Sequence, residues 1–259
     1  MKRQLIALLG LAISTPAMAG PFDGTWKADA NSTQLNARLK VQSISNGVYR
    51  CSSCIHPFSI PADGKPHAVL LDENGKNVES VSVINARTIV IKDTKGNQLI
   101  ETSTLTAMPD GKSLRVITKE IGANGKIITT QQLRRRVAPG PSGSHAISGS
   151  WQDDKIEKVD EAALIITLKE TGGVLHMSTG TGTSYNARIG GPAVPIKGDR
   201  EGTMASLRRT APMILVETDT VKGKVVAVNT MVIISPTTMK IASEDRQRGG
   251  VDRFVAHKQ

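Results

Sequence analysis

The chain has 259 residues, with 33 Lys and Arg against 23 Asp and Glu, and a formal net charge of +10. Aromatic residues make up only 3% of it, which leaves few platforms for stacking bases, so we expect no nucleic-acid partner. No apolar run approaches the ~20 residues that span a bilayer, so we also expect a chain that is not membrane-spanning.

The first nineteen residues have the pattern of a secretory signal peptide. Lys2 and Arg3 precede an apolar run over residues 5–13, and small residues lead up to Ala19. We expect cleavage after Ala19 and a periplasmic or secreted protein.

The basic excess lies mainly in the first half of the remaining chain. Residues 20–138 contain 16 Lys and Arg against 10 Asp and Glu, whereas residues 139–259 contain 15 against 13. An excess of positive charge creates an electric field that attracts polyanions, whatever the fold. The first half is therefore a candidate surface for an anionic polymer of the cell envelope.

Both halves have the periodicity of β-strands. Short runs rich in Val, Ile and Thr are separated by Gly, Asn or Asp, which favours antiparallel pairing through tight turns. Only residues 152–164 could form a single helical piece. We expect an all-β fold with about eight strands in each half, forming small barrels or sandwiches. The clearest predicted strands cover residues 80–93, 99–108, 112–122, 163–170, 174–179, 214–220 and 225–235.

Both cysteines of the chain lie in the stretch "GVYRCSSCIHPF". In an exported protein, Cys51 and Cys54 are expected to form a disulfide, which requires a turn between them because strand residues three apart lie too far from each other. A second interpretation is a zinc or copper site made by Cys51, Cys54, His56 and His67, whose sulfur and imidazole donors suit these metals. A thiol-redox role is a third, although the helix that activates such thiols is missing from the pattern.

Two motifs recur in the same order. "FDGTWKAD" at residues 22–29 matches "ISGSWQDD" at 147–154, and the stretch that begins "KGNQL" at Lys95 matches the stretch that begins "KGKVV" at Lys222. A repeat of this length indicates an internal duplication rather than a solenoid. We expect two domains, residues 20–138 and 148–259, joined by a linker rich in Pro, Gly and Ser at residues 139–147.

The "GTWK" start followed by a meander of strands resembles calycin-type barrels, the lipocalins and fatty-acid-binding proteins, and also secreted bacterial lipocalin-like proteins. In that superfamily the Trp packs beneath an Arg or Lys of the last strand. The resemblance implies that Trp26 packs under Arg134 or Arg136. It equally implies that Trp151 packs under Arg253 or Lys258, with a cation–π attraction of about 0.5–2 kcal/mol.

No catalytic motif is present: the sequence lacks a Gly-x-Ser-x-Gly elbow, a His-Glu-x-x-His pair and a phosphate-binding glycine loop. We therefore expect a non-enzymatic protein that binds an apolar or amphipathic small molecule in a barrel mouth or an inter-domain groove. The alternatives are an envelope or surface interaction protein that binds anionic polymers, and a metal-handling or thiol-redox protein that uses Cys51 and Cys54. No cofactor is expected apart from the possible zinc or copper.

Overall fold

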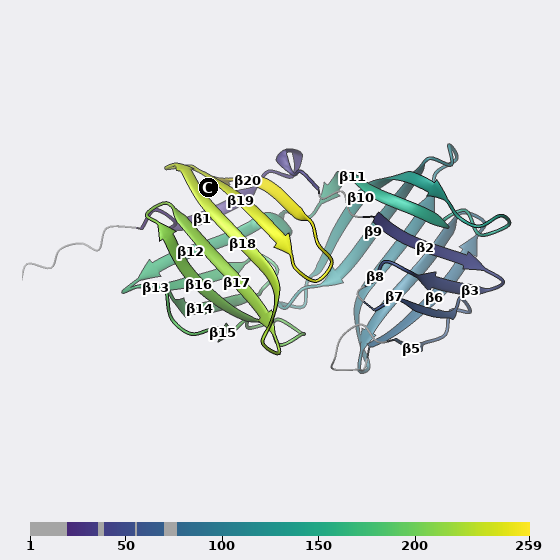
Figure 1. Ribbon diagram of the computed structural model, residues 1–259, viewed down its shortest axis with the longest axis horizontal. Helices are drawn as coiled ribbons and strands as arrows, with labels where there is room; N and C mark the ends of the chain where they lie inside the picture. Colours follow the sequence, from purple (N-terminus) through teal and green to yellow (C-terminus); the bar gives the residue numbers. More distant parts are fainter. Residues whose placement is uncertain (1–19, 36–38, 55, 70–76) are drawn as a thin grey trace, which may run out of the picture.

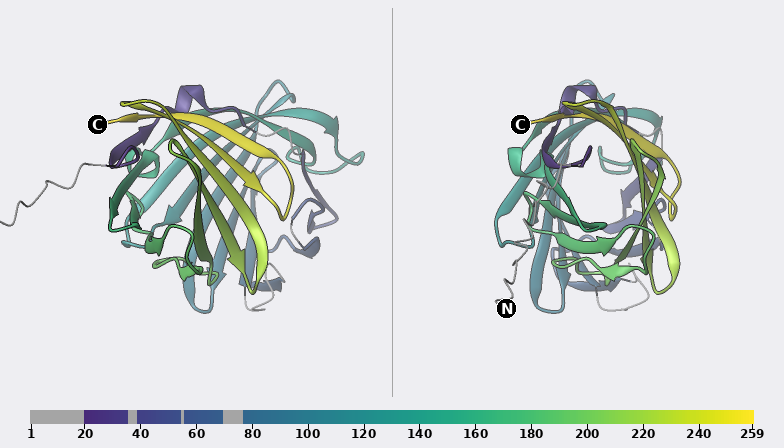
Figure 2. Two further views of the ribbon diagram at one scale, coloured as in Figure 1. Left: turned by 60° about the vertical axis from the view of Figure 1, so that its left-hand side comes forward. Right: turned by 90° about the vertical axis from the view of Figure 1, so that its left-hand side faces the viewer.

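The computed structural model describes residues 20–35, 39–54, 56–69 and 77–259 of the protein. The predicted signal peptide, residues 1–19, lies outside the described residues. The fold is all-β, as predicted, and consists of two ten-stranded antiparallel sheets, each curled into a nearly closed barrel (Figures 1 and 2). Each sheet thus has two strands more than predicted.

The barrel that we call the first is built from one continuous stretch of chain, and the second is built from two separate stretches. The first barrel has the strand order β4-β3-β2-β11-β10-β9-β8-β7-β6-β5. The second has the order β14-β13-β12-β1-β20-β19-β18-β17-β16-β15. The strands of the first barrel are β2 (Leu39–Ser45), β3 (Val48–Cys51), β4 (Phe58–Pro61), β5 (His67–Val69), β6 (Asn77–Asn85), β7 (Thr88–Lys95), β8 (Gln98–Ala107), β9 (Ser113–Ile121), β10 (Ile127–Pro139) and β11 (Gly149–Val159). Those of the second are β1 (Gly24–Ala28), β12 (Ile165–Thr171), β13 (Val174–Thr179), β14 (Ser184–Arg188), β15 (Val194–Pro195), β16 (Met204–Ala211), β17 (Ile214–Val221), β18 (Lys224–Ser235), β19 (Thr238–Asp245) and β20 (Val251–Lys258).

The opening strands of the two repeats are exchanged between the barrels. Strand β1 lies between β12 and β20 of the second repeat, and β11 lies between β10 and β2 of the first. The predicted partition into residues 20–138 and 148–259 is therefore wrong for these two strands. Each barrel is completed by the strand that opens the other repeat.

The hairpin formed by β10 and β11 explains the exchange. The two strands pair from Thr130 opposite Val159 to Pro139 opposite Gly149, with three register shifts between these ends. The segment predicted as an inter-domain linker is thus largely the loop of this hairpin, and Pro139 itself ends β10. A run of Pro, Gly and Ser suits a tight return of the chain as well as it suits a linker.

The predicted helical piece at residues 152–164 is also wrong. Residues up to Val159 belong to β11, and only the 3₁₀ turn η2 (Glu161–Leu164) follows before β12 begins. Pairing with β10 overrides the weak local helical pattern, because it gives backbone groups of residues 152–159 hydrogen-bond partners on a neighbouring strand. A second 3₁₀ turn, η1 (Ala30–Ser32), follows β1 on the way to the first barrel.

Each barrel has its own apolar core, and each core has a Trp at one end. Trp26 packs with Phe22, Leu168 and other residues of the second barrel, while Trp151 packs with Ile147 and Leu114 of the first. Both indole rings are completely buried. At the other end the core gives way to polar residues, and this is where the two barrels face each other.

Candidate functional site

The two Gly-x-Trp motifs form the same local structure in both repeats. The indole Nε1 of Trp26 donates to the carbonyl of Phe22, and that of Trp151 donates to the carbonyl of Ile147, each at 2.8 Å. The glycine two residues earlier has a φ of +137° at Gly24 and +139° at Gly149, a conformation that favours glycine. A Cβ at either glycine would collide with the cation above the ring.

The cations above the two rings differ from the predicted ones because of the strand exchange. Lys258 lies over the ring of Trp26, with Nζ 5.3 Å from its centroid, and Arg136 lies over Trp151 at 4.0 Å. The prediction that Trp26 packs under Arg134 or Arg136, and Trp151 under Arg253 or Lys258, is therefore wrong in its partners. A last-strand cation still covers each Trp, but it comes from the other repeat.

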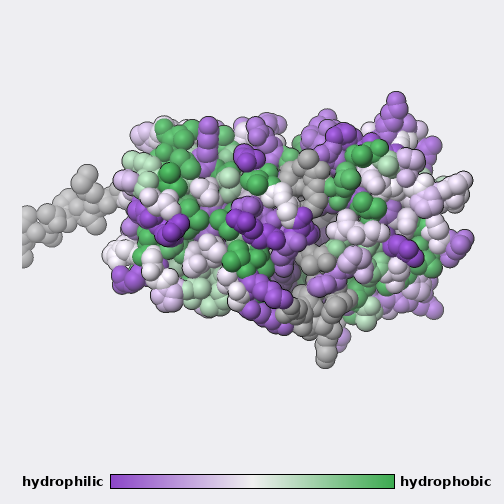
Figure 3. All heavy atoms as spheres, in the orientation of Figure 1, coloured by the Kyte–Doolittle hydropathy of each residue, from purple (hydrophilic) through white to green (hydrophobic). Residues whose placement is uncertain are grey.

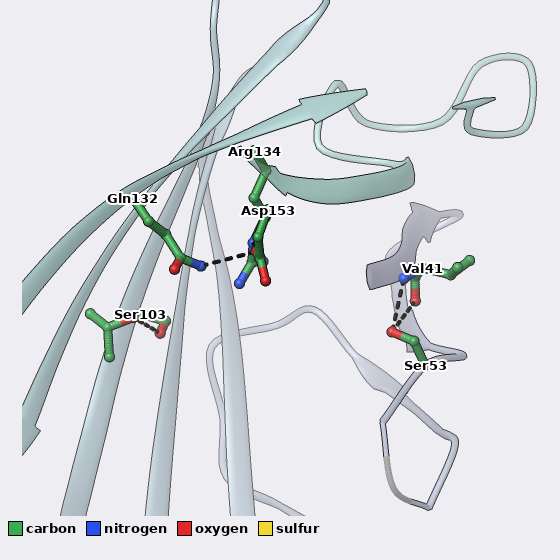
Figure 4. A network of polar contacts seen from close by, with 7 residues as sticks. Val41, Ser53, Ser103, Gln132, Arg134 and Asp153 are labelled. Carbon is green, nitrogen blue, oxygen red and sulfur yellow. Dashed lines mark hydrogen bonds and ion pairs between the residues drawn. The ribbon is translucent and has the colours of Figure 1, made fainter. Parts of the chain in front are cut away.

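Arg134 and Arg253, the other two arginines of the prediction, have different contacts. Arg134 forms an ion pair with Asp153 of β11, with Nε 2.8 Å from Oδ1, and Gln132 donates to the same carboxylate at 3.4 Å (Figure 4). Arg253 pairs through its backbone with Gln34, on the connection from β1 toward the first barrel. Neither arginine covers a Trp.

Cys51 and Cys54 form the expected disulfide, with their Cα atoms 5.6 Å apart. The required turn is held by Ser53, whose Oγ accepts from the backbone N–H of Val41 at 2.8 Å (Figure 4). Sulfurs bonded to each other are not thiolates and so are not metal ligands in this state.

The two histidines of the predicted metal cluster are engaged separately. His67 Nε2 lies 2.9 Å from Asp63 Oδ1, and His56 lines the space between the barrels. Within the described part of the chain, no three His, Cys, Asp or Glu side chains are grouped so as to hold a metal ion. The zinc or copper interpretation stays a prediction for the reduced protein.

A cleft of about 780 Å³ separates the two barrels. It lies at the strand ends remote from the Trp residues: on β10 of the first barrel, for example, Ile128 lines the cleft, whereas Arg136 covers Trp151. The barrels touch at its edge, where Asn124 donates to the carbonyls of Gly180 and Thr181. Hydrophilic side chains border the junction on the face seen in Figure 3.

Both walls of the cleft carry charge. The wall from the first barrel is mainly acidic, and the wall from the second barrel carries several cations. Arg200 bridges the two, because it donates to the carbonyl of Ile121 and its own carbonyl accepts from Lys95. The charged residues that line the cleft are Asp93, Lys95, Glu101 and Glu120 of the first barrel, and Asp199, Arg200, Glu201, Lys222, Lys224 and Arg248 of the second.

The acidic side chains of this wall, Asp93, Glu101 and Glu120, belong to a row of four carboxyl groups on neighbouring strands. Glu79 on β6 lies opposite Asp93 on β7, Asp93 lies opposite Glu101 on β8, and Glu101 lies opposite Glu120 on β9. We call these four residues the acidic row. It runs from the buried Glu79 to the exposed Glu120. Like charges directly opposite each other destabilise a sheet.

The surroundings of the acidic row raise the pKa values of several of its carboxyl groups. Burial and the charge of Asp93 raise the pKa of Glu79 to about 9. Burial and the charge of Glu101 raise the pKa of Asp93 to about 6. Burial and Glu101 also raise the pKa of Glu120, and the nearby Arg200 opposes that rise. At neutral pH the buried end of the row is therefore partly protonated.

The second barrel has a different arrangement at the matching positions. There the register aligns Ala205, Asp219, Ala227 and Asp245, so two of the four acids are replaced by Ala. Its buried acid Glu217 has donors instead: Tyr185 and Asn229 both bond to it. Burial and the charge of Glu217 raise the pKa of Asp219 to about 7.

Sequence reasoning did not find the acidic row, because its members are 8 to 41 residues apart in the chain. Strand register alone places them side by side. The usable signal was an acid within otherwise apolar or hydroxyl-rich strands, as in "NVESVSV" and "LIETSTL", where the inward-facing position predicts a hydrophobic side chain.

The fold and the cleft define a tandem β-barrel protein with exchanged opening strands and a charged inter-barrel site. No model of a known protein family matches the chain, and searches of curated proteins and of solved structures likewise found no match. No helix among the described residues has both the length and the apolar character to cross a membrane.

Proposed function

We propose that the protein is an exported, non-enzymatic binding protein and that its small-molecule ligand occupies the cleft between the barrels. The observation that carries this proposal is the cleft itself, about 780 Å³ in volume and lined by strand ends of both barrels. Small-molecule sites typically have volumes of a few hundred to 1,000 Å³ and form preferentially at domain interfaces.

The charges of the cleft favour an amphipathic ligand over a wholly apolar one. Burying charged walls against an apolar molecule would cost free energy without any compensating bond. Apolar side chains such as Ile100, Ile128 and Val226 supply patches between the charges. A ligand with polar ends and an apolar middle matches this lining.

The exported location is supported by the Cys51–Cys54 disulfide, since such bonds persist in oxidising compartments. The polyanion interpretation stays a prediction. After the strand exchange the continuous stretch of residues 39–159 carries 16 Lys and Arg against 11 Asp and Glu. Basic residues are also numerous in the second barrel, so the structure does not single out the first barrel as the basic one.

Native mass spectrometry tests the cleft as the binding site. The protein would be incubated with a small-molecule extract of the medium in which it was produced and then exchanged into a volatile buffer. We expect one adduct of a few hundred daltons on the wild type and none on Val226→Trp, which places a bulky ring in the cleft. Val225→Trp is the matched control, because Val225 is 44% exposed and does not line the cleft.

Two outcomes would contradict the proposal. One is a wild-type protein that takes up no small molecule. The other is an adduct that Val226→Trp retains as well as Val225→Trp does, provided that both variants unfold at the wild-type temperature.

A further inference from the structure

We propose that the acidic row binds the ammonium group of a small organic molecule whose other end is neutral or anionic. This inference rests on the proposed function, because it names the chemistry of the ligand within the same cleft. Its first support is the register of the strands, which brings four carboxyl groups side by side, and three of them, Asp93, Glu101 and Glu120, line the cleft.

The second barrel indicates that the fold itself does not require these acids. At the positions that match Glu79 and Glu101 in the register, it has Ala205 and Ala227, and its sheet pairs in the same way. A row of like charges that costs stability, and in which an equivalent sheet replaces two of the four acids with alanine, is best explained by a ligand that compensates the charge.

A buried acceptor without a donor supplies the independent second observation. Among the residues that the structure describes, the side-chain oxygen Oδ1 of Asn77 has no hydrogen-bond partner, although Asn77 is only 9% exposed and lines the cleft. An unsatisfied buried acceptor is costly, and a ligand N–H would satisfy it. Oδ1 of Asp93 and Oε2 of Glu79 also lack a donor unless a proton lies between the two carboxyl groups.

Three of the protein's own donors near the row are already engaged. Ser103 Oγ lies 2.8 Å from Glu101 Oε1, and Arg134 is bonded to Asp153. Lys95 donates to the carbonyl of Arg200. An ammonium group offers three N–H donors on one compact cation, which suits several converging acceptors.

The opposite wall limits what the rest of the ligand can be. Arg200 and Arg248 of the second barrel line the cleft, and Lys222 and Lys224 do so as well. These cations would repel a second positive charge but accept a carboxylate or a neutral polar group. An organic ammonium fits better than a metal ion, since the described residues provide no three-ligand metal group.

Isothermal titration calorimetry with 6-aminohexanoate tests the inference, and hexanoate is the matched probe without the ammonium group. We expect saturable binding of 6-aminohexanoate and no binding of hexanoate over the same concentration range. Glu101→Ala, which reproduces the second barrel's Ala227, should weaken binding at least tenfold. Asp219→Asn in the second barrel should leave the affinity within about twofold.

Glu101→Gln is a second variant that keeps the side-chain volume, and it should weaken binding like Glu101→Ala. Equal affinity for hexanoate, or unchanged affinity in both Glu101 variants, would overturn the inference. Displacement of 6-aminohexanoate by calcium chloride at one ion per protein would show a metal site instead.

The two proposals fail in different ways. If Val226→Trp abolishes uptake from the extract but 6-aminohexanoate does not bind, the cleft function stands and the ammonium inference falls. If 6-aminohexanoate binds through Glu101 but Val226→Trp has no effect on any ligand, the acidic row binds ammonium groups and the proposal that the cleft holds the ligand falls.

Discussion

The two barrels are alike at the Trp end and different at the cleft end. Each has a Gly-x-Trp start, an indole that donates to a carbonyl four residues earlier, and a cation over the ring. At the cleft end the first barrel has four acids in register where the second has two acids and two alanines. The shared end holds each barrel together, whereas the end that differs is where we place the ligand.

The variant with the largest expected loss of stability, Trp26→Ala, tests the strand exchange. Trp26→Ala should lower the free energy of unfolding by about 3–5 kcal/mol, because it removes a completely buried aromatic ring. Since β1 lies between β12 and β20, we expect the loss of amide hydrogen-exchange protection in those two strands. Trp151→Ala should affect β10 and β2 instead.

Deprotection of β2 and β10 by Trp26→Ala would contradict the exchange. That result would mean that the first strand of each repeat completes its own barrel, as the sequence alone predicted.

The next prediction concerns the stability that is lost when the cation over either Trp ring is removed. Arg136 lies 4.0 Å from the ring centroid of Trp151 and also donates to the carbonyls of Gly111, Ala146 and Ser148. Arg136→Ala should therefore cost about 2–3 kcal/mol of unfolding free energy, since it removes the cation–π contact and leaves carbonyls without a donor.

Lys258 lies farther from its ring, at 5.3 Å, so Lys258→Ala should cost only about 1 kcal/mol. Urea unfolding of both variants gives the comparison. Equal losses would mean that the carbonyl contacts of Arg136 contribute nothing to stability.

A third prediction distinguishes the cleft ends of the two barrels by the pH dependence of their stability. The folded protein raises the pKa of Glu79 to about 9 through burial and the charge of Asp93, whereas an unfolded Glu titrates near pH 4. The folded chain then binds more protons, so this stability is present at low pH and is lost as pH rises toward 9. At about 1.4 kcal/mol per pH unit and proton, the loss between pH 5 and pH 8 should be at most about 4 kcal/mol.

Glu79→Gln should flatten this dependence, as measured by urea unfolding at several pH values. Asp219→Asn is the corresponding variant in the second barrel, where burial and the charge of Glu217 raise the pKa of Asp219 to about 7. The contribution of protonated Asp219 to the free energy of unfolding should therefore be lost by about pH 7. Stability curves of wild type and Glu79→Gln that stay parallel from pH 5 to pH 8 would contradict the assignment.

The sequence by itself determined the strand content, the duplication and the disulfide. Alternation of apolar and polar residues, the two Gly-x-Trp motifs and the spacing of Cys51 and Cys54 are local patterns, and local physical chemistry is enough to interpret them.

Only the tertiary structure decided which strand completes which barrel and which side chains meet. Trp26 has equivalent partners in both repeats, so the choice between them depends on whether the chain turns back after Pro139, and the composition of that loop permits either path. The acidic row depends on the register of four strands, and a shift of one residue in any of them would turn its acid to the other face. Pairing between distant segments sets that register, and no local pattern contains it.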